Sequence, residues 1–438
     1  MSPESGERTR VVVSGMGVIT PIGSDLEAFW QALLAGRSGV RRITQFDAED
    51  LPCQIAGEVP DFVPERYIPL KEERRMARAS QMALAAAQAA VSDAKLGLPL
   101  ANPERVAVYF GTAIGGFDRA VEGVEILRAK GYAHVNPFYL PSAIPNMPAF
   151  HVTQHFGALG ANCTITTACA TGTQTVGEAS LAIRHGRADI VIAGGTEALI
   201  RDFTIGGFAS MRALPVSFND QPDQASRPFD AKREGFVFSE GAACLVLERL
   251  DSALARGAHI YAEVAGIGTS SDAFHIAAPD PSAAGAIRTM AWALQDAQLA
   301  PDDVDYINAH GTSTPANDAV ETLAIKRLFG ERAYNIPVSS TKSMLGHAMG
   351  ASGAIEAVVC ALTIDRGMIH PTINYDYPDP VCDLDYVPNQ PRKANVRVAI
   401  SNSFGLGGQN ACLVMRAANR FETKRGDHGD GRVEAGLG

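Results

Sequence analysis

The sequence predicts an α/β protein whose chain is built from two similar halves. Short runs rich in valine, isoleucine and other apolar residues alternate with segments of helical periodicity along most of the chain, and such alternation is typical of α/β folds. Two kinds of segment also recur in the same order in both halves, which indicates an internal duplication. Because 46% of the 438 residues are hydrophobic and only 20% are charged, the composition excludes a disordered chain and allows a large core.

The expected elements can be placed in order along the chain. The first is a buried strand over 11–14, followed by a helix that starts with the capping-box pair Ser24 and Glu27 and stops at Gly36. Residues 419–438 are polar and rich in glycine, so we expect a disordered tail there. Six further strands are expected at residues 106–110, 163–167, 189–194, 244–248, 305–309 and 396–401.

The duplication is visible in two repeated patterns. The heptapeptides AVSDAKL (90–96) and ALQDAQL (293–299) each close a predicted helix and lead to a strand that ends in Gly-Thr. The pattern A-x-G-x5-E-A directly follows both Cys169 and His347. Two matches in one order favour duplication over chance and place Cys169 and His347 at equivalent helix starts.

The N-terminal segment has some features of a signal peptide, because Arg8 and Arg10 precede an apolar run. Gly15, Gly17 and Pro21 interrupt that run, and no small-residue cleavage site follows it. The chain has no stretch of 18 or more apolar residues, so a membrane-spanning helix is not expected. We therefore expect a cytoplasmic protein without membrane insertion.

Charge, cysteine usage and glycine spacing argue against other classes of protein. The net charge of −10 disfavours nucleic-acid binding. Seven cysteines stand singly without a CxxC pair, which fits neither a disulfide framework nor a zinc site. After Gly15 and Gly17 the next glycine, Gly23, comes too late for the GxGxxG pattern of dinucleotide-binding folds, so dinucleotide binding is not expected.

Cys169 is the strongest candidate for a catalytic residue. It follows a predicted strand and begins a helical stretch rich in alanine, threonine and glycine, where the positive end of the helix dipole would lower the pKa of its thiol. The alternative is a buried structural thiol in a tight turn, which is the commoner role of a single cysteine.

Two histidines lie in similar surroundings. His310 ends a predicted strand before a turn with Gly311 and Pro315, and His347 stands between Lys342 and a glycine-rich helix start. Either histidine could be structural by itself, but a cysteine with two histidines at such positions indicates nucleophilic and acid–base chemistry on an acyl group or thioester. A metal site is the alternative for these residues. They include no HExxH motif and no i, i+4 pair, so no metal is expected.

A glycine-dense loop, SFGLGGQN (403–410), follows the last predicted strand. Its backbone N–H groups could hold an oxyanion or a phosphate, and a plain tight turn explains the stretch equally well.

Lys71, Arg74, Arg75 and Arg78 form a basic stripe on a predicted helix of this acidic protein. A solvated helix face is the simplest interpretation, and the docking of an acidic partner is the alternative.

Four motifs together resemble those of one enzyme family, the β-ketoacyl-acyl-carrier-protein synthases of the elongating type, and within it the synthase II group. The similarity extends from about Arg10 to Met415 and keeps the order of the motifs. The motifs are TACATG (167–172), NAHGTSTP (308–315), STKSMLGH (340–347) and NSFGLGG (402–408).

The resemblance implies a thiolase fold, in which two α/β halves form a five-layer α-β-α-β-α sandwich and the chain is a homodimer. An N-terminal half over 1–258 would carry the nucleophilic cysteine, and a C-terminal half over 259–418 would carry both histidines.

The resemblance also implies a decarboxylative condensation of acyl and malonyl thioesters of acyl-carrier protein, with no metal or cofactor. Cys169 would take the acyl group, while His310 and His347 would hydrogen-bond the malonyl thioester carbonyl and stabilise its enolate. Lys342 would orient the two histidines, together with Glu356.

Further roles follow from the same resemblance. The backbone N–H groups of Cys169 and Phe404 would form the oxyanion hole, and Phe404 would gate the acyl tunnel. The other expected site residues are Gly405 and Gly407 in the gating loop, Thr312 and Thr314 at the pantetheine arm, Ile114 in the tunnel, Asp318 in structural support, and Lys71, Arg74 and Arg75 in carrier docking.

Some positions depart from the usual motifs of that family. Leu406 and Gln409 replace the more common phenylalanine and threonine, and Phe238-Ser239 replace an apolar residue followed by glycine. The segment ALPVSFND (213–220) is one residue longer than usual and lacks an arginine. The sequence therefore leaves the preferred acyl chain and the carrier affinity open.

Two other functions are compatible with parts of this pattern. A specialised ketosynthase of polyketide or unusual lipid synthesis would share the chemistry and differ in its carrier and acyl chain. A non-catalytic chain-length partner would lack the nucleophile, so Cys169 argues against that function.

Overall fold

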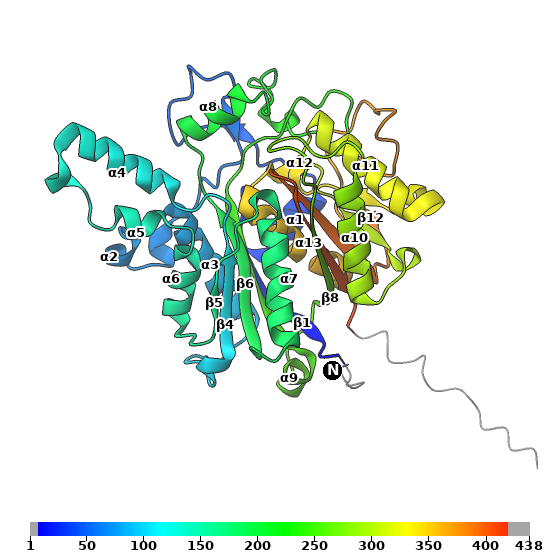
Figure 1. The fold of residues 1–438 in the computed structure, drawn as a ribbon, viewed down its shortest axis with the longest axis horizontal. Coiled ribbons are helices and arrows are strands. Elements are labelled where there is room, and N and C mark those ends of the chain that lie inside the picture. Colours follow the sequence, from blue (N-terminus) through cyan, green and yellow to red (C-terminus); the bar gives the residue numbers. More distant parts are fainter. Residues whose placement is uncertain (1–7, 419–438) are drawn as a thin grey trace, which may run out of the picture.

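One mixed sheet of ten strands runs through the centre of the molecule (Figure 1). The computed structural model describes residues 8–418, so the tail expected over 419–438 lies outside the described residues. In spatial order the strands are β10 Val338–Ser339, β9 Tyr306–Asn308, β13 Val398–Gly405, β14 Gln409–Arg416, β8 Ala262–Ser271, β1 Val11–Ile19, β7 Gly241–Arg249, β6 Ile190–Glu197, β4 Val106–Gly111 and β5 Asn162–Cys163. Two small sheets pair β2 Arg41–Arg42 with β3 Ile55–Ala56 and β11 Met368–Ile369 with β12 Arg392–Lys393.

The two halves of the large sheet follow the same strand order. Outward from the centre, one half reads β1, β7, β6, β4, β5 and the other reads β8, β14, β13, β9, β10. Numbered by chain order within each half, both read first, fifth, fourth, second, third. Within residues 8–418 the two half-sheets pair with each other where Val12 and Val13 of β1 lie opposite Glu263 and Ala262 of β8. This repeated topology confirms the duplication predicted from the sequence.

The side chains of successive residues in a strand pack into different hydrophobic cores on the two faces of the sheet. Helices on these faces and the two half-sheets together form five layers. In β4, Val108 packs into the core shared with α3, whereas Ala107 packs into the central core around α7 and α13. In β13, Ile400 packs toward α10 and α11, whereas Ala399 belongs to the central core. Because successive strand residues point to opposite faces, each half-sheet is buried on both sides. The result is the predicted α-β-α-β-α sandwich.

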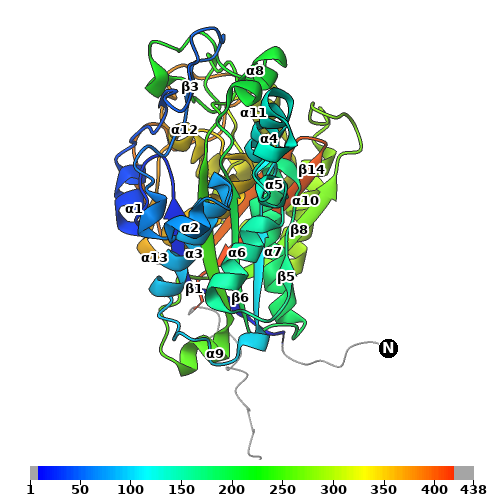
Figure 2. The ribbon, with the colours of Figure 1, turned by 90° about the vertical axis from the view of Figure 1, so that its left-hand side faces the viewer.

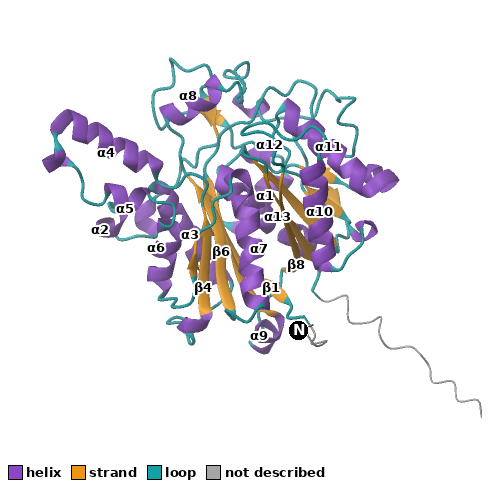
Figure 3. Ribbon diagram, in the orientation of Figure 1, coloured by secondary structure: helices purple, strands orange, loops and turns teal. Residues whose placement is uncertain are grey.

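Helices lie outside and between the two half-sheets (Figure 3). The helices α3 and α6 cover one outer face, α7 and α13 fill the middle, and α10 and α11 cover the other outer face. The helices α4, α5 and α6 lie on the side of the molecule that faces the viewer in Figure 2. The helices are α1 Leu26–Leu34, α2 Leu70–Glu73, α3 Arg78–Asp93, α4 Phe117–Lys130, α5 Tyr139–Ala143, α6 Met147–Phe156, α7 Thr171–Arg184, α8 Asp202–Ser210, α9 Leu250–Ala255, α10 Ala284–Ala297, α11 Pro315–Phe329, α12 Lys342–Leu345 and α13 Ser352–Arg366.

Two local predictions were wrong. The strand predicted over 163–167 ends at Cys163, because residues 164–167 leave β4 and carry the chain toward Cys169. The N-cap of α1 is Asp25 rather than Ser24, since the Asp25 carboxylate accepts the backbone N–H groups of the next helical turn.

The predicted basic helix is also interrupted. Helix α2 ends at Glu73, and α3 begins at Arg78. Arg78 does not belong to the exposed stripe, because it forms a 2.8 Å ion pair with the buried carboxylate of Glu240.

Across residues 8–418, none of the helices combines the length and the apolar character that crossing a bilayer requires.

Candidate active site

Two helix starts meet in the centre of the molecule and carry Cys169 and His347. Cys169 lies in a 3₁₀ turn directly before α7, and His347 lies just before the turn that leads into α13. The glycine of the repeated A-x-G pattern permits this approach, since a Cβ atom on Gly172 would lie 2.4 Å from the backbone nitrogen of Ala354. A larger residue at position 172 would push the two helix starts apart.

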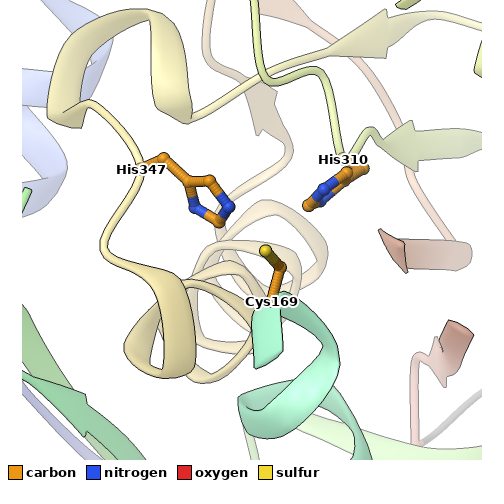
Figure 4. Close-up of side chains that lie close together, drawn as sticks. All are labelled: Cys169, His310 and His347. Atoms are coloured by element: carbon orange, nitrogen blue, oxygen red, sulfur yellow. The ribbon is translucent and has the colours of Figure 1, made fainter. Parts of the chain in front are cut away.

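The side chains of Cys169, His310 and His347 converge on one point (Figure 4). Their sulfur and ring-nitrogen atoms lie within 4.8 Å of one another, and all three residues are buried. The two imidazole rings are 5.5 Å apart and nearly perpendicular. This donor set could also hold a soft divalent ion such as zinc, so the expected absence of a metal stays a prediction.

Burial dominates the protonation of Cys169. It raises the pKa of the thiol to about 11, although hydrogen bonds from backbone N–H groups and the charge of Lys342 act in the opposite direction. The prediction that the helix start lowers this pKa was therefore wrong, because desolvation outweighs the hydrogen bonds and the charge that favour the thiolate. At neutral pH the site holds a thiol.

His310 follows β9 and is fixed through its backbone and its ring. Its N–H donates to Oε1 of Glu321 at 2.9 Å, and the N–H of Gly311 donates to Oε2 at 2.8 Å. The Lys342 Nζ atom lies 3.4 Å from Nδ1 of His310. Burial, and then the charge of Lys342, hold the pKa of His310 well below its usual range. The ring is therefore neutral, and with a cationic donor at Nδ1 it carries its proton on Nε2.

Only one of the two ring nitrogens of His347 has a hydrogen-bond partner among the described residues. Its Nδ1 lies 3.0 Å from the Ser352 hydroxyl, whereas its Nε2 is buried without a hydrogen-bond partner among the described residues. Burial and the charge of Lys342 also hold the pKa of this ring well below its usual range. The ring points toward Cys169 (Figure 4), and a buried, unpartnered nitrogen in that position suits a substrate group.

Lys342 forms a buried ion pair with Glu356 of α13. Burial raises the pKa of Glu356 against the pull of the Lys342 charge. This geometry places Lys342 against His310, where its orienting role was expected. Asp318 contacts other parts of the fold, since it accepts the Phe229 N–H at 2.8 Å and lies 3.6 Å from the Arg233 guanidinium.

The β13–β14 hairpin brings the glycine-dense loop over Cys169. Gly407 and Gly408 have φ angles of 83° and 70°, a region that favours glycine. The backbone N–H of Leu406, in this loop, acts to lower the pKa of the Cys169 thiol. Phe404 lies opposite Asn410 in the strand register, and its role as an oxyanion donor stays a prediction.

The Phe404 ring lies 5.8 Å from the His310 ring, at the side of the cavity where a gate was expected. Gly405 lets the loop approach the nucleophile, because a Cβ atom there would lie 2.8 Å from the carbonyl oxygen of Thr167.

A cavity of about 400 Å³ contains the three reactive side chains, a size typical of small-ligand sites. Thr312 and Thr314 line it, with their hydroxyl oxygens 2.9 Å apart. Ile114 is absent from its wall and instead packs against the hydrophobic cluster that includes Cys169 and Met349. The predicted tunnel residue thus packs against the same cluster as the nucleophile without lining this cavity.

The predicted docking residues lie together on the surface. Lys71, Arg74 and Arg75 are exposed and line a hollow of about 330 Å³ with Asn136 and Phe138. The guanidinium of Arg75 lies 4.6 Å from the centre of the Phe138 ring, which holds one positive charge in a defined place.

Sequence reasoning missed several polar residues around the site. Glu321 accepts the backbone of His310, and Ser352 contacts the ring of His347. Glu197 accepts the N–H groups of Ala113 and Gly350 at 2.9 and 3.2 Å, so it ties the loop after β4 to the helix start of His347. Only the position of Ser352, inside the repeated A-x-G-x5-E-A pattern, could have drawn attention to it.

Comparison with known proteins gives a consistent family. Residues 8–253 match the β-ketoacyl synthase N-terminal domain, and residues 261–376 match the C-terminal domain. The chain is 50% identical over 410 residues to 3-oxoacyl-[acyl-carrier-protein] synthase 2 of Synechocystis sp., covering 94% of this chain and 98% of that protein. The corresponding protein of Coxiella burnetii is 48% identical over 409 residues, covering 93% and 99% of the two chains.

Solved structures agree with the sequence matches. The ishigamide ketosynthase/chain length factor superposes with a TM-score of 0.87 at 39% identity, over 94% of this chain and all of that chain. A β-ketoacyl synthase from Burkholderia phymatum gives a TM-score of 0.87 at 36% identity, over 93% and 99% of the two chains. With the five-layer architecture and the Cys-His-His site, these matches establish that the chain has the thiolase fold and belongs to the β-ketoacyl synthase family.

Proposed function

We propose that this protein condenses an acyl group with a malonyl group, both carried by acyl-carrier protein, to give 3-oxoacyl-carrier protein in fatty acid elongation. The observation that carries the proposal is the convergence of one thiol and two neutral imidazoles in a buried cavity. Relatives with nearly 50% identity over almost the whole chain bear the name of this activity.

In the first step the Cys169 sulfur attacks the carbonyl of the acyl thioester. The bond from carbonyl carbon to the carrier sulfur breaks, and the thiol proton of Cys169 leaves with the carrier thiol. The backbone N–H groups of Cys169 and Phe404 stabilise the negative oxygen of the tetrahedral intermediate. The product is an acyl-Cys169 thioester and free carrier.

In the second step a malonyl thioester enters the same cavity. Loss of carbon dioxide leaves an electron pair that delocalises onto the thioester oxygen, where the Nε2–H groups of His310 and His347 stabilise it. The resulting carbanion attacks the acyl-Cys169 carbonyl and expels the cysteine sulfur. The expelled Cys169 thiolate takes up one proton from water, which restores the thiol. The products are 3-oxoacyl-carrier protein and carbon dioxide, and no change of oxidation state is required.

The remaining site residues support substrate binding in this proposal. Thr312 and Thr314 bind the pantetheine arm where they line the cavity, and Ile114 shapes the end of the acyl chain. Lys71, Arg74 and Arg75 bind the acidic carrier protein. A ketosynthase that is 37% identical to this chain has been solved in complex with its acyl-carrier protein.

We also propose a division into an N-terminal half over 1–258 and a C-terminal half over 259–418. The boundary lies between β7 and β8, the last strand of one half-sheet and the first strand of the other.

A homodimer would cover one exposed side of the molecule. The edge strand β5 pairs only with β4, and the adjacent helices expose Leu127, Leu140, Ile144 and Phe150 by 40% or more. Large apolar groups on one side of a monomer are typical of an interface. Sedimentation equilibrium should give twice the chain mass, and a monomer at micromolar concentration would contradict this part of the proposal.

The central test is the intact mass of the protein after incubation with a medium-chain acyl-carrier protein. We expect an acyl adduct that is absent from Cys169→Ala, and that malonyl-carrier protein discharges as a 3-oxoacyl product. An adduct that survives the substitution would overturn Cys169 as the nucleophile.

A specialised ketosynthase is the second candidate, because Leu406 and Gln409 differ from the usual gating loop and a structural relative holds a hexaketide. An adduct formed only with unusual acyl chains would favour that candidate.

A further inference from the structure

Ser352 makes a contact that none of the roles above explains. It begins α13, is only 4% exposed, and places its hydroxyl oxygen 3.0 Å from Nδ1 of His347. Within residues 8–418 this is the one side-chain hydrogen bond of Ser352.

We propose that Ser352 is a positioning residue that selects the reactive tautomer of His347. Its hydroxyl donates to Nδ1, so the single proton of the neutral ring stays on Nε2, the nitrogen that faces Cys169. The consequence for catalysis rests on the proposed condensation, whereas the tautomer itself does not.

The direction of the hydrogen bond follows from counting donors and acceptors. If Ser352 donates, its hydroxyl proton and the Nδ1 lone pair are both satisfied. If Nδ1–H donated instead, the buried hydroxyl proton would have no acceptor, and an Nε2 lone pair would face the cavity. An unsatisfied buried donor is costly, so the first arrangement is favoured.

The two histidines then receive equivalent support from different residues. Lys342 lies at Nδ1 of His310 and is also paired with Glu356, and no hydrogen bond joins it to His347 among the described contacts. His347 therefore needs a donor of its own. Ser352 supplies one without adding a second charge beside the ring.

The tautomer matters because negative charge develops on the substrate oxygen. An Nε2–H group stabilises that charge, whereas an Nε2 lone pair repels it. A histidine held in the wrong tautomer can lose most of its catalytic effect even when its position is unchanged.

The direct test is long-range ¹H–¹⁵N correlation spectroscopy of the full-length protein with ¹⁵N-labelled histidine. Signals of His347 are assigned by their loss in His347→Asn. We expect Nε2 protonated and Nδ1 unprotonated across about pH 6–8, where an unperturbed histidine would change charge. A protonated Nδ1 would overturn the proposal whatever reaction the enzyme catalyses.

The kinetic test compares Ser352→Ala, Ser352→Thr and a control, Ser180→Ala. Ser180 is a fully buried serine of α7 whose hydroxyl bonds only the Gly177 carbonyl, so its removal tests the effect of losing any buried hydroxyl. Ser352→Ala should slow malonyl decarboxylation by roughly 10- to 100-fold, because His347 loses the partner that holds its proton on Nε2. The rate of acyl transfer to Cys169 should stay within about 3-fold of the wild-type rate, because His347 is not used in that step. Ser352→Thr should restore the rate.

Each outcome bears on a different claim. Unchanged decarboxylation and an unchanged His347 tautomer in Ser352→Ala would overturn the positioning role. If the wild-type enzyme condensed no acyl thioester at all, the proposed function would fail, while the tautomer spectrum would still decide the role of Ser352.

Discussion

The Nζ atom of Lys342 lies 3.4 Å from Nδ1 of His310. Burial is the main cause that lowers the pKa of both histidines, and the charge of this ammonium group lowers it further. The same group forms the buried ion pair with Glu356. Burial and one cation therefore keep two rings neutral, and the cation fixes the proton of one of them. A buried pair adds little net stability, but either partner alone leaves an uncompensated charge in the core.

Lys342→Met should consequently lower the free energy of unfolding by about 3–5 kcal/mol, because it leaves Glu356 unpaired. Lys342→Met/Glu356→Gln removes both charges and should recover most of that loss. Chemical denaturation measures the stability, and decarboxylation of malonyl-carrier protein measures the function. We expect decarboxylation at least about tenfold below wild type in both variants, because His310 loses its Nδ1 partner. A fully active double variant would show that the lysine acts only on stability.

The reactivity of Cys169 in the absence of substrate should depend on pH as that of a buried thiol. Because burial raises its pKa to about 11, the thiolate fraction increases with pH up to that value. Alkylation by iodoacetamide should rise by about tenfold per unit between roughly pH 7 and 9, since the thiolate is the nucleophile. Intact mass measures the rate, and Cys169→Ala gives the background from the other six cysteines. A rate independent of pH between about 6 and 8 would instead indicate a thiolate–imidazolium pair.

The basic patch of Lys71, Arg74 and Arg75 should affect the binding of the carrier protein and not the chemical steps of the condensation. Changing all three to glutamate should raise KM for acyl-carrier protein by at least about tenfold and weaken its dependence on salt, because opposite charges steer the encounter. Small pantetheine thioesters should be unaffected. Lys393→Glu is the matched control, an exposed cation on β12. An equal loss with carrier-bound and small substrates would place the defect in the active site.

The architecture could be predicted because local sequence patterns indicate its strands, its helices and its duplication. The alternation of strands and helices, and the two repeats, gave the duplicated α/β fold that the strand order confirms. Cys169, His310 and His347 were identified for the same reason, since each stands beside glycines at a strand or helix end. Their reactive atoms lie within 4.8 Å of one another, and this proximity depends on the tertiary structure, so it could not be predicted from their spacing along the chain.

The errors concern quantities that depend on three-dimensional surroundings. The helix start at Cys169 suggested a lowered thiol pKa, but complete burial has the larger effect. Glu321 and Ser352 were missed because a carboxylate or hydroxyl on a helix gives no sign of which backbone or ring it will meet.

The approach of the glycine-dense loop gives a further prediction. Gly405→Ala would place a Cβ atom 2.8 Å from the Thr167 carbonyl oxygen and 3.3 Å from the backbone nitrogen of Cys169. The loop must then move away from Cys169, and the Phe404 N–H that we propose as an oxyanion donor moves with it. We expect kcat for condensation to fall by roughly 100-fold, the usual effect of losing an oxyanion donor, with a destabilisation of about 1–3 kcal/mol from overpacking. Gly97→Ala is the control, since a Cβ atom there meets nothing within 4 Å, and it should match wild type in both rate and melting temperature. Normal turnover by Gly405→Ala would mean that the Phe404 N–H does not stabilise the reacting oxygen.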